Sequence, residues 1–213
     1  MKKILVALTL ILLSTYLFAQ RGDINTDIFG NLQFKSTDGQ YTASLEQRIF
    51  DELIFSDSHK NKVEFEKKYL DKIAPGLQGN KESQIRMMKR LIRENRRRSN
   101  YKATFKIDIF DKIIVEDNKG YKLEEGKDIF GNMDVKEEFD GSKSQLKRNM
   151  RGGLEYTRDN NNASLEKDIF DKWIYKDTFG NEIQFNKVVW NRVVKQYGSE
   201  ENFFWRLLDQ YFY

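Results

Sequence analysis

Seven cationic side chains lie between residues 86 and 98 and could together bind an anion. They share this segment with apolar residues at helical spacing, Ile85, Met88 and Ile92, so the pattern predicts one amphipathic helix with cations on its outer faces. Such a helix is typical of contact with lipopolysaccharide, membrane headgroups, an acidic glycan or extracellular nucleic acid. The simpler interpretation is a solvated helix whose late positive charges complement its own dipole. The candidate binding residues are Arg86, Lys89, Arg90, Arg93, Arg96, Arg97 and Arg98.

The charge is distributed unevenly along the chain. Residues 81–106 contain ten Lys and Arg against two Glu, a net charge of +8. The formal charge of +4 becomes +2 when a predicted signal peptide at residues 1–19 takes away Lys2 and Lys3, so the rest of the mature chain carries −6. This is not the overall balance of a nucleic-acid-binding protein, and no recognition module is visible. We expect an envelope protein or an anionic polymer or lipid surface as partner, and no sequence-specific nucleic acid.

Aspartates recur at fixed places and raise the possibility of calcium binding. A calcium loop, however, supplies many oxygen ligands from one segment, whereas each turn here offers one or two. Aspartate as a turn-forming residue is the favoured interpretation, and no metal site or cofactor is expected. The recurring positions are Asp51, Asp111 and Asp171, and Asp57, Asp117 and Asp177.

Few features of the sequence point to a catalytic site. His59 is the only histidine and lies in a turn, and the absence of cysteine excludes a thiol nucleophile. A single histidine does not make a typical zinc site. A pair of carboxylates for glycan hydrolysis stays open as an alternative, because acids are plentiful and nothing singles out a pair. We expect a protein that is not an enzyme, and assign no catalytic residue.

A short turn phrase repeats along the chain and indicates how these groups are positioned. Asp27-Ile28-Phe29-Gly30-Asn31 returns at 128–132, and in a variant form at 177–181. Related Ile-Phe-Asp phrases occupy 49–51, 109–111 and 169–171, which gives a period of about 20 residues. An aspartate that bonds forward to the backbone, followed three residues later by a residue at positive φ, predicts a type I turn closed by a left-handed residue.

The segments between the turns have the length and composition of strands. The sequence therefore predicts an α+β fold, an antiparallel β-meander of short hairpin repeats of about 20 residues per unit, interrupted and ended by two helical hairpins. The phenylalanine of each turn phrase is expected to fold back onto the sheet and to stack with its neighbours in the core. These rings are Phe29, Phe50, Phe110, Phe130 and Phe170.

A longer duplication overlies the short repeat. Residues 44–65 match residues 164–185 at an offset of 120, and both copies run into helical sequence. The helix pairs are predicted at 66–98 and 186–212, with a helix beginning after Ser199. The predicted organisation is a signal peptide at 1–19, a first half at 20–100 and a second half at 101–213. In the last helix, we expect Phe204, Leu207, Leu208 and Tyr211 to cover the apolar face of the sheet.

The Asp-Ile-Phe-Gly-Asn phrases, each followed by an aromatic residue and another turn, resemble the YD-type β-hairpin repeats of bacterial secreted and cell-surface proteins. The resemblance covers about half of the mature chain and implies a hairpin array without catalysis. The tyrosine that precedes the aspartate in that family is missing, since Thr26, Lys127 and Lys176 stand there. The helix pairs have no counterpart in the family, so no functional residue is transferred.

The first residues predict export. Lys2 and Lys3 precede an apolar stretch that ends near Ala19, as in a signal peptide, and the stretch is shorter than the roughly 20 apolar residues of a membrane span. We expect no transmembrane span after signal removal. The short signal resembles those of Gram-negative Bacteroidetes-type secreted proteins, which implies a periplasmic, extracellular or cell-surface location.

The sequence favours a non-catalytic binding or structural module at the bacterial envelope. Two alternatives stay open: a carbohydrate-active hydrolase with an Asp/Glu pair, and an envelope or toxin-associated protein that recognises one protein partner.

Overall fold

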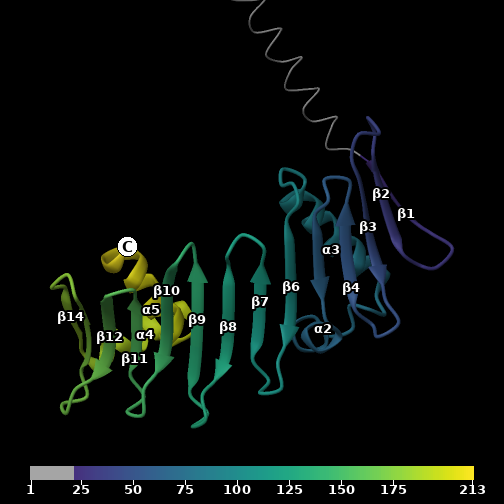
Figure 1. The fold of residues 1–213 in the computed structure, drawn as a ribbon. Coiled ribbons are helices and arrows are strands. Elements are labelled where there is room, and N and C mark those ends of the chain that lie inside the picture. The colour runs from purple at the N-terminus through teal and green to yellow at the C-terminus, as the bar shows by residue number, and fades with distance from the viewer. Residues whose placement is uncertain (1–21) are drawn as a thin grey trace, which may run out of the picture. The chain divides into compact units, whose positions relative to one another are not determined.

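The computed structural model describes residues 22–213, so the predicted signal peptide lies outside the described residues. These residues form fourteen strands, which follow one another in chain order in a mostly antiparallel open sheet, and four α-helices (Figure 1). The predicted α+β meander of short hairpins is thereby confirmed. Within 22–213, no helix is both long and apolar enough to cross a membrane.

The chain divides into two compact units. Unit one comprises residues 22–107 and 115–119, and unit two comprises 108–114 and 120–213. The sequence-based division at 100/101 places strand β6 (Lys102–Ile107) with the second half, whereas this strand lies in unit one.

Unit one holds six strands, two helices and part of β7 (Ile113–Asp117). Five strands run antiparallel in chain order, and β5 and β6 pair in parallel. The parallel pair arises because the helix pair between them returns the chain to the end of the sheet where β5 began. The elements are β1 (Gly22–Thr26), β2 (Leu32–Ser36), β3 (Thr42–Gln47), β4 (Leu53–Asp57), β5 (Lys62–Phe65), α2 (Lys67–Ile73), α3 (Lys81–Asn95) and β6 (Lys102–Ile107).

Both helices of unit one cover the same sheet face. Alternate residues of β2, such as Leu32 and Phe34, point into the core, and Gln33 and Lys35 between them are exposed. Helix α3 contributes Met88, Leu91 and Ile92 to this core. The predicted alternation of the strands and the apolar stripe of the helix therefore meet in one layer.

Unit two is an antiparallel meander with a helix pair at its C-terminal end. Its helices cover one face of the last strands (Figure 1). There the rings of Trp173 and Trp190 stack with their centroids 4.3 Å apart. The elements are β8 (Lys122–Lys127), β9 (Met133–Phe139), β10 (Ser142–Arg148), β11 (Leu154–Arg158), β12 (Asn161–Lys167), β13 (Trp173–Asp177), β14 (Glu182–Phe185), α4 (Lys187–Tyr197), α5 (Glu200–Leu207) and a π-helical turn η1 (Leu208–Phe212).

The C-terminal helix packs largely as the sequence predicts. Phe204, Leu207 and Leu208 are buried, while Tyr211 lies at the margin and is partly exposed. The Ser199 hydroxyl accepts a hydrogen bond from the Asn202 backbone N–H at 3.1 Å, which confirms the predicted helix start.

The 120-residue duplication appears as identical strand register inside each unit. Leu45 pairs with Phe55 in unit one, and Leu165 pairs with Tyr175 in unit two. The inward-facing positions of the two copies thus correspond, although their residues differ in size.

The repeated turns have the predicted chemistry. In the first of them, Asp27 Oδ1 accepts backbone hydrogen bonds from Phe29 at 2.9 Å and Asn31 at 2.8 Å. Gly30 closes that turn at φ +85°, and Asp171 takes the corresponding left-handed position at +64°. Asp57 and Asp177 bond forward in the same way at other turns, so the aspartates are turn-forming residues.

The prediction for the phenylalanines of the turn phrases is wrong. These five rings are 67–83% exposed, and the isoleucine before each is 89–95% exposed. The reason is geometric: both residues occupy the two central positions of the turn, beyond the last strand pair, where their side chains leave the sheet. The aromatic core is built instead from strand and helix residues such as Phe55, Tyr175 and Phe204.

Candidate functional site

Helix α3 presents the predicted cations because one side of it is fixed against the sheet. Asn80 caps its first turn by accepting a hydrogen bond from the Ser83 backbone N–H at 3.0 Å. Met88 is fully buried, and Leu91 and Ile92 are nearly so, which orients the remaining faces toward solvent. The predicted helix thus exists, but it ends at Asn95, so Arg96 and Arg97 follow it in a turn and Arg98 lies directly after that turn.

The structure divides the seven predicted residues among three environments. One group lines a groove between α3 and the β1–β2 hairpin, with a volume of about 500 Å³. Its lining is Gly22, Ile24, Phe34, Lys89, Ile92, Arg93, Arg96 and Arg97. Four of the seven candidate residues therefore come together around an apolar floor.

The other three candidate residues have different roles. Arg86 lies 3.7 Å from Glu82, and Arg90 lies 2.7 Å from Glu94, both as ion pairs one helical turn apart. These two arginines line a separate groove on the α2 side of the helix. Arg98 stacks its guanidinium over the Tyr101 ring, 4.4 Å from the centroid. The seven candidate residues are therefore divided, and four of them line one groove.

Three cations of the groove are available to a ligand. Lys89, Arg93 and Arg97 form no side-chain hydrogen bond or ion pair with any residue of 22–213. Arg96 is different, because its guanidinium lies 5.3 Å from the centroid of the Tyr41 ring.

Arg96 lies near a small polar cluster at the end of the groove. The hydroxyl of Tyr41 donates a hydrogen bond to Asp57 at 2.9 Å, and its pKa is raised, mainly by burial and then by that bond. The nearby Asp38 has a lowered pKa, first because of the hydrogen bond from Ser36 and to a smaller extent because of the Arg96 charge. The tyrosine therefore stays a neutral donor, and the aspartate stays ionised beside the arginine.

The composition of the groove suits an amphipathic anion. Arg93 and its neighbours can bind a phosphate or carboxylate at the rim, and Ile24 and Phe34 offer a floor to hydrocarbon. The floor residues were not among the sequence candidates. The signal that could have found them is the alternation of β1 and β2, which places Ile24 opposite Phe34 in register.

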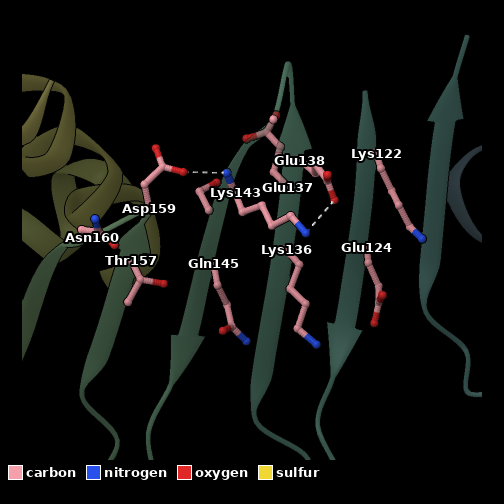
Figure 2. A pocket seen from close by; sticks show the side chains of 12 residues that line it. Lys122, Glu124, Lys136, Glu137, Glu138, Lys143, Gln145, Thr157, Asp159 and Asn160 are labelled. Atoms are coloured by element: carbon pink, nitrogen blue, oxygen red, sulfur yellow. Dashed lines mark hydrogen bonds and ion pairs between the residues drawn. The ribbon is translucent and has the colours of Figure 1, made fainter. Parts of the chain in front are cut away.

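A second concavity bears on the hydrolase alternative. It lies on the polar face of β8–β11 in unit two, has a volume of about 670 Å³ and contains several carboxylates (Figure 2). Glu138 lies 3.6 Å from the Lys143 amine, and Asp159 accepts the Lys143 backbone N–H at 3.0 Å. That backbone bond, followed by the bond from Ser142, lowers the pKa of Asp159. A general acid in glycan hydrolysis needs a raised pKa, so this environment does not suit Asp159 to that role.

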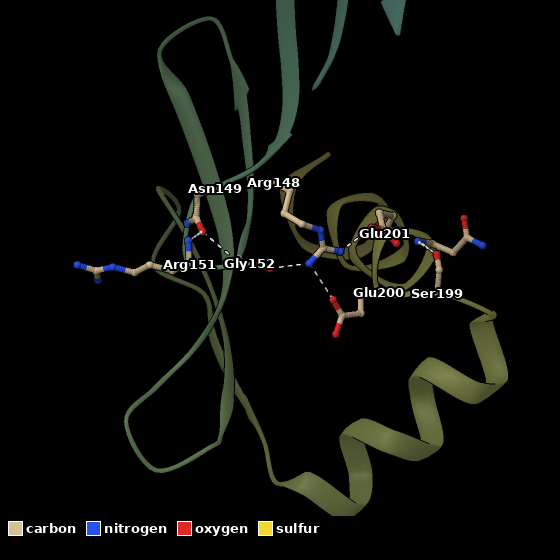
Figure 3. Close-up of polar contacts among 9 residues, drawn as sticks. Arg148, Asn149, Arg151, Gly152, Ser199, Glu200 and Glu201 are labelled. Carbon is tan, nitrogen blue, oxygen red and sulfur yellow. Dashed lines mark hydrogen bonds and ion pairs between the residues drawn. The ribbon is translucent and has the colours of Figure 1, made fainter. Parts of the chain in front are cut away.

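The Arg148 cluster in unit two is a structural clamp. The Arg148 guanidinium binds Glu200 at 2.9 Å and also Glu201, both at the start of α5, and donates to the carbonyl of Gly152 (Figure 3). It thereby ties the helix N-terminus to the β10–β11 turn. In residues 22–213, no three His, Asp or Glu side chains are grouped so that they could hold a metal ion.

No family model matches this chain, and no curated protein matches it. One solved structure that it resembles is the G-box domain of the microcephaly protein CPAP, whose structural analysis suggests a role in centriole elongation. The match covers 78% of this chain and 99% of that chain at 10% sequence identity, with a TM-score of 0.16. A similarity at that TM-score supports no argument about fold or function.

Proposed function

We propose that the protein is a non-catalytic binding module of the Gram-negative envelope that holds amphipathic anions in the groove beside α3. The observation that supports this most directly is the set of three unpaired cations, Lys89, Arg93 and Arg97, around an apolar floor. The envelope setting rests on the predicted export signal.

The spacing of the cations favours a ligand. Lys89 and Arg93 lie four residues apart on α3, where like charges destabilise a helix by about 0.2–0.5 kcal/mol. On the flank of the helix that faces α2, Arg90 is neutralised by Glu94 at the same spacing. A bound anion would provide for Lys89 and Arg93 the partner that the chain itself provides for Arg90.

The apolar floor narrows the class of ligand. A purely ionic polymer would leave the exposed part of Ile24 in the groove without an apolar contact, whereas a lipid with an anionic headgroup would use both parts of the groove. We therefore favour an anionic lipid over an acidic glycan or a nucleic acid.

The test measures co-sedimentation of the mature chain with vesicles of phosphatidylcholine, with and without phosphatidylglycerol. Arg93→Glu with Arg97→Glu should abolish the part of the binding that depends on phosphatidylglycerol. The matched control is Arg86→Glu with Arg90→Glu, which changes the net charge equally at the separate groove on the α2 flank and should retain most of the binding that depends on phosphatidylglycerol.

Equal losses of vesicle binding in the two double variants would mean that only the net charge matters, and would refute the groove as the binding site. Capture of one protein partner by a chain that ignores anionic vesicles would instead favour the partner-specific alternative.

A further inference from the structure

The exposed turn residues of unit two form a row at one end of its strands. The turns after β8, β10 and β12 all lie at the same end, because neighbouring strands are antiparallel (Figure 1). The turn before Lys112 belongs to the row as well, since Lys112 contacts Glu124 of β8 at 2.6 Å. The row consists of Ile109-Phe110, Ile129-Phe130, Met150 and Ile169-Phe170, all exposed. We call these residues the tip row.

The turn itself does not require apolar residues at these places. The central positions of a type I turn accept most residue types. At the other end of the same strands, the β9–β10 and β11–β12 turns carry Asp140-Gly141 and Asp159-Asn160. A third turn there has the same aspartate bonding and contains Phe179, which contacts the Phe212 ring at 5.4 Å. The phenylalanines of the tip row have no such ring contact with any residue of 22–213 to explain them.

The tips are regularly spaced and stand free. Successive tips are two strands apart, which corresponds to about 9–10 Å. Ile129 is 93% exposed, so almost every side of its side chain faces solvent. A rigid protein surface would cover only one side of such a tip, whereas a deformable apolar medium would surround it.

The charges behind the tips are mixed in sign. Asp128 follows Lys127, and Asp168 lies between Lys167 and Lys172 in the sequence. Carboxylates and amines therefore occur together at the base of an apolar tip. Zwitterionic lipid headgroups have the same mixture above an apolar layer, and apolar groups bury about 5–10 Å into that boundary.

We propose that the tip row of unit two inserts into the interfacial region of a lipid bilayer. This site is separate in its chemistry from the basic groove and goes beyond the proposed function. Insertion depends on apolar burial and is therefore not weakened by salt, while anion capture by the groove is weakened by salt. The two sites can fail independently in experiment.

The first test uses vesicles of phosphatidylcholine alone, at high salt, with the full mature chain. Replacing four tip residues together, Ile129→Ser, Phe130→Ser, Ile169→Ser and Phe170→Ser, should lower the vesicle-bound fraction about tenfold or more. Circular dichroism and the urea midpoint should match the parent, because these side chains contribute little to the core. Unchanged binding by a folded quadruple variant would overturn the proposal.

The second test places a fluorescent reporter at the tip. Phe130→Trp should shift its emission to the blue and be quenched by brominated phosphatidylcholine. Asn160→Trp is the matched control at the opposite end of the strands and should show neither change. Equal behaviour of the two reporters would overturn insertion. Lipid-free dimerisation that the serine variant abolishes would also overturn it, because the row would then be the interface with a second copy.

Discussion

Serine at the turn tips should leave the protein almost as stable as the parent. In unit two, Ile169 is 92% exposed and Phe170 is 75% exposed. Full burial of such a side chain contributes about 1.5–3 kcal/mol, so the buried quarter of Phe170 contributes less than about 0.8 kcal/mol, and Ile169 contributes almost nothing. The double variant Ile169→Ser, Phe170→Ser should therefore lose less than about 1 kcal/mol of unfolding free energy.

The assay is urea unfolding followed by far-ultraviolet circular dichroism. The control is Leu165→Ala in the same unit, whose fully buried side chain should cost about 2–5 kcal/mol. The slope of the transition should stay equal in all three proteins for the midpoints to be comparable. A loss above about 2 kcal/mol in the tip variant would mean that the rings pack in solution. That result would restore the original sequence interpretation and remove the basis of the tip-row proposal.

Three further results follow from named contacts. Asp168→Ala removes the acceptor of two backbone hydrogen bonds, at 2.8 and 2.9 Å, and should lower the unfolding free energy by about 1 kcal/mol. Asp168→Asn should retain most of that free energy, because Asn149 accepts the same two bonds at the equivalent turn. Gly126→Ala would place its Cβ 2.5 Å from Lys112 Cγ and 3.2 Å from Lys112 Cα. We therefore expect the unfolding free energy to fall by about 1–3 kcal/mol in the same urea assay. For Glu201, burial is the largest single influence and raises the pKa, but the bond from Arg148 and smaller contributions outweigh it, so the folded pKa lies below the ordinary 4.5. Its stabilising effect is therefore complete above pH 4.5 and lost as the pH falls through the folded value, so the midpoint difference between the parent and Glu201→Gln should shrink below pH 4.5. A difference that grows with acid would contradict the Arg148 clamp.

The local features of this fold could be predicted because they depend on short-range chemistry. The aspartate of each turn, its left-handed closing residue and the helix cap at Ser199 all act within five residues of sequence. The duplication predicted matching registers, since two similar segments meet the same alternation of inward and outward positions.

The parallel pairing of β5 and β6 could not be predicted in the same way. It depends on where the helix pair delivers the chain in space, and neither strand encodes that direction. For a similar reason, the sequence predicted only in part the grouping of Lys89, Arg93, Arg96 and Arg97. Helical periodicity placed cations on outer faces, but the groove exists because β1 and β2 lie beside one of those faces.

The error over the turn phenylalanines has a different origin. An aromatic residue is most often buried, so a repeated ring predicts a core, but a turn directs its two central side chains away from the sheet. The hydrogen bonds of the turn fix the residues at both ends of the phrase and leave the two central ones unconstrained by the fold.

The turn therefore separates folding from surface chemistry. Its ends, such as Asp128 and Gly131, determine the backbone, and the residues between them can vary without cost to the sheet. In a repeat of this kind, each further copy of the hairpin adds the same exposed side chains at a regular distance from the previous copy. Several weak apolar contacts on one chain then act together, because the first contact raises the effective concentration of the others. Such an array can bind a broad surface without any deep pocket, which is consistent with a row of exposed Ile-Phe pairs at one end of the strands of unit two.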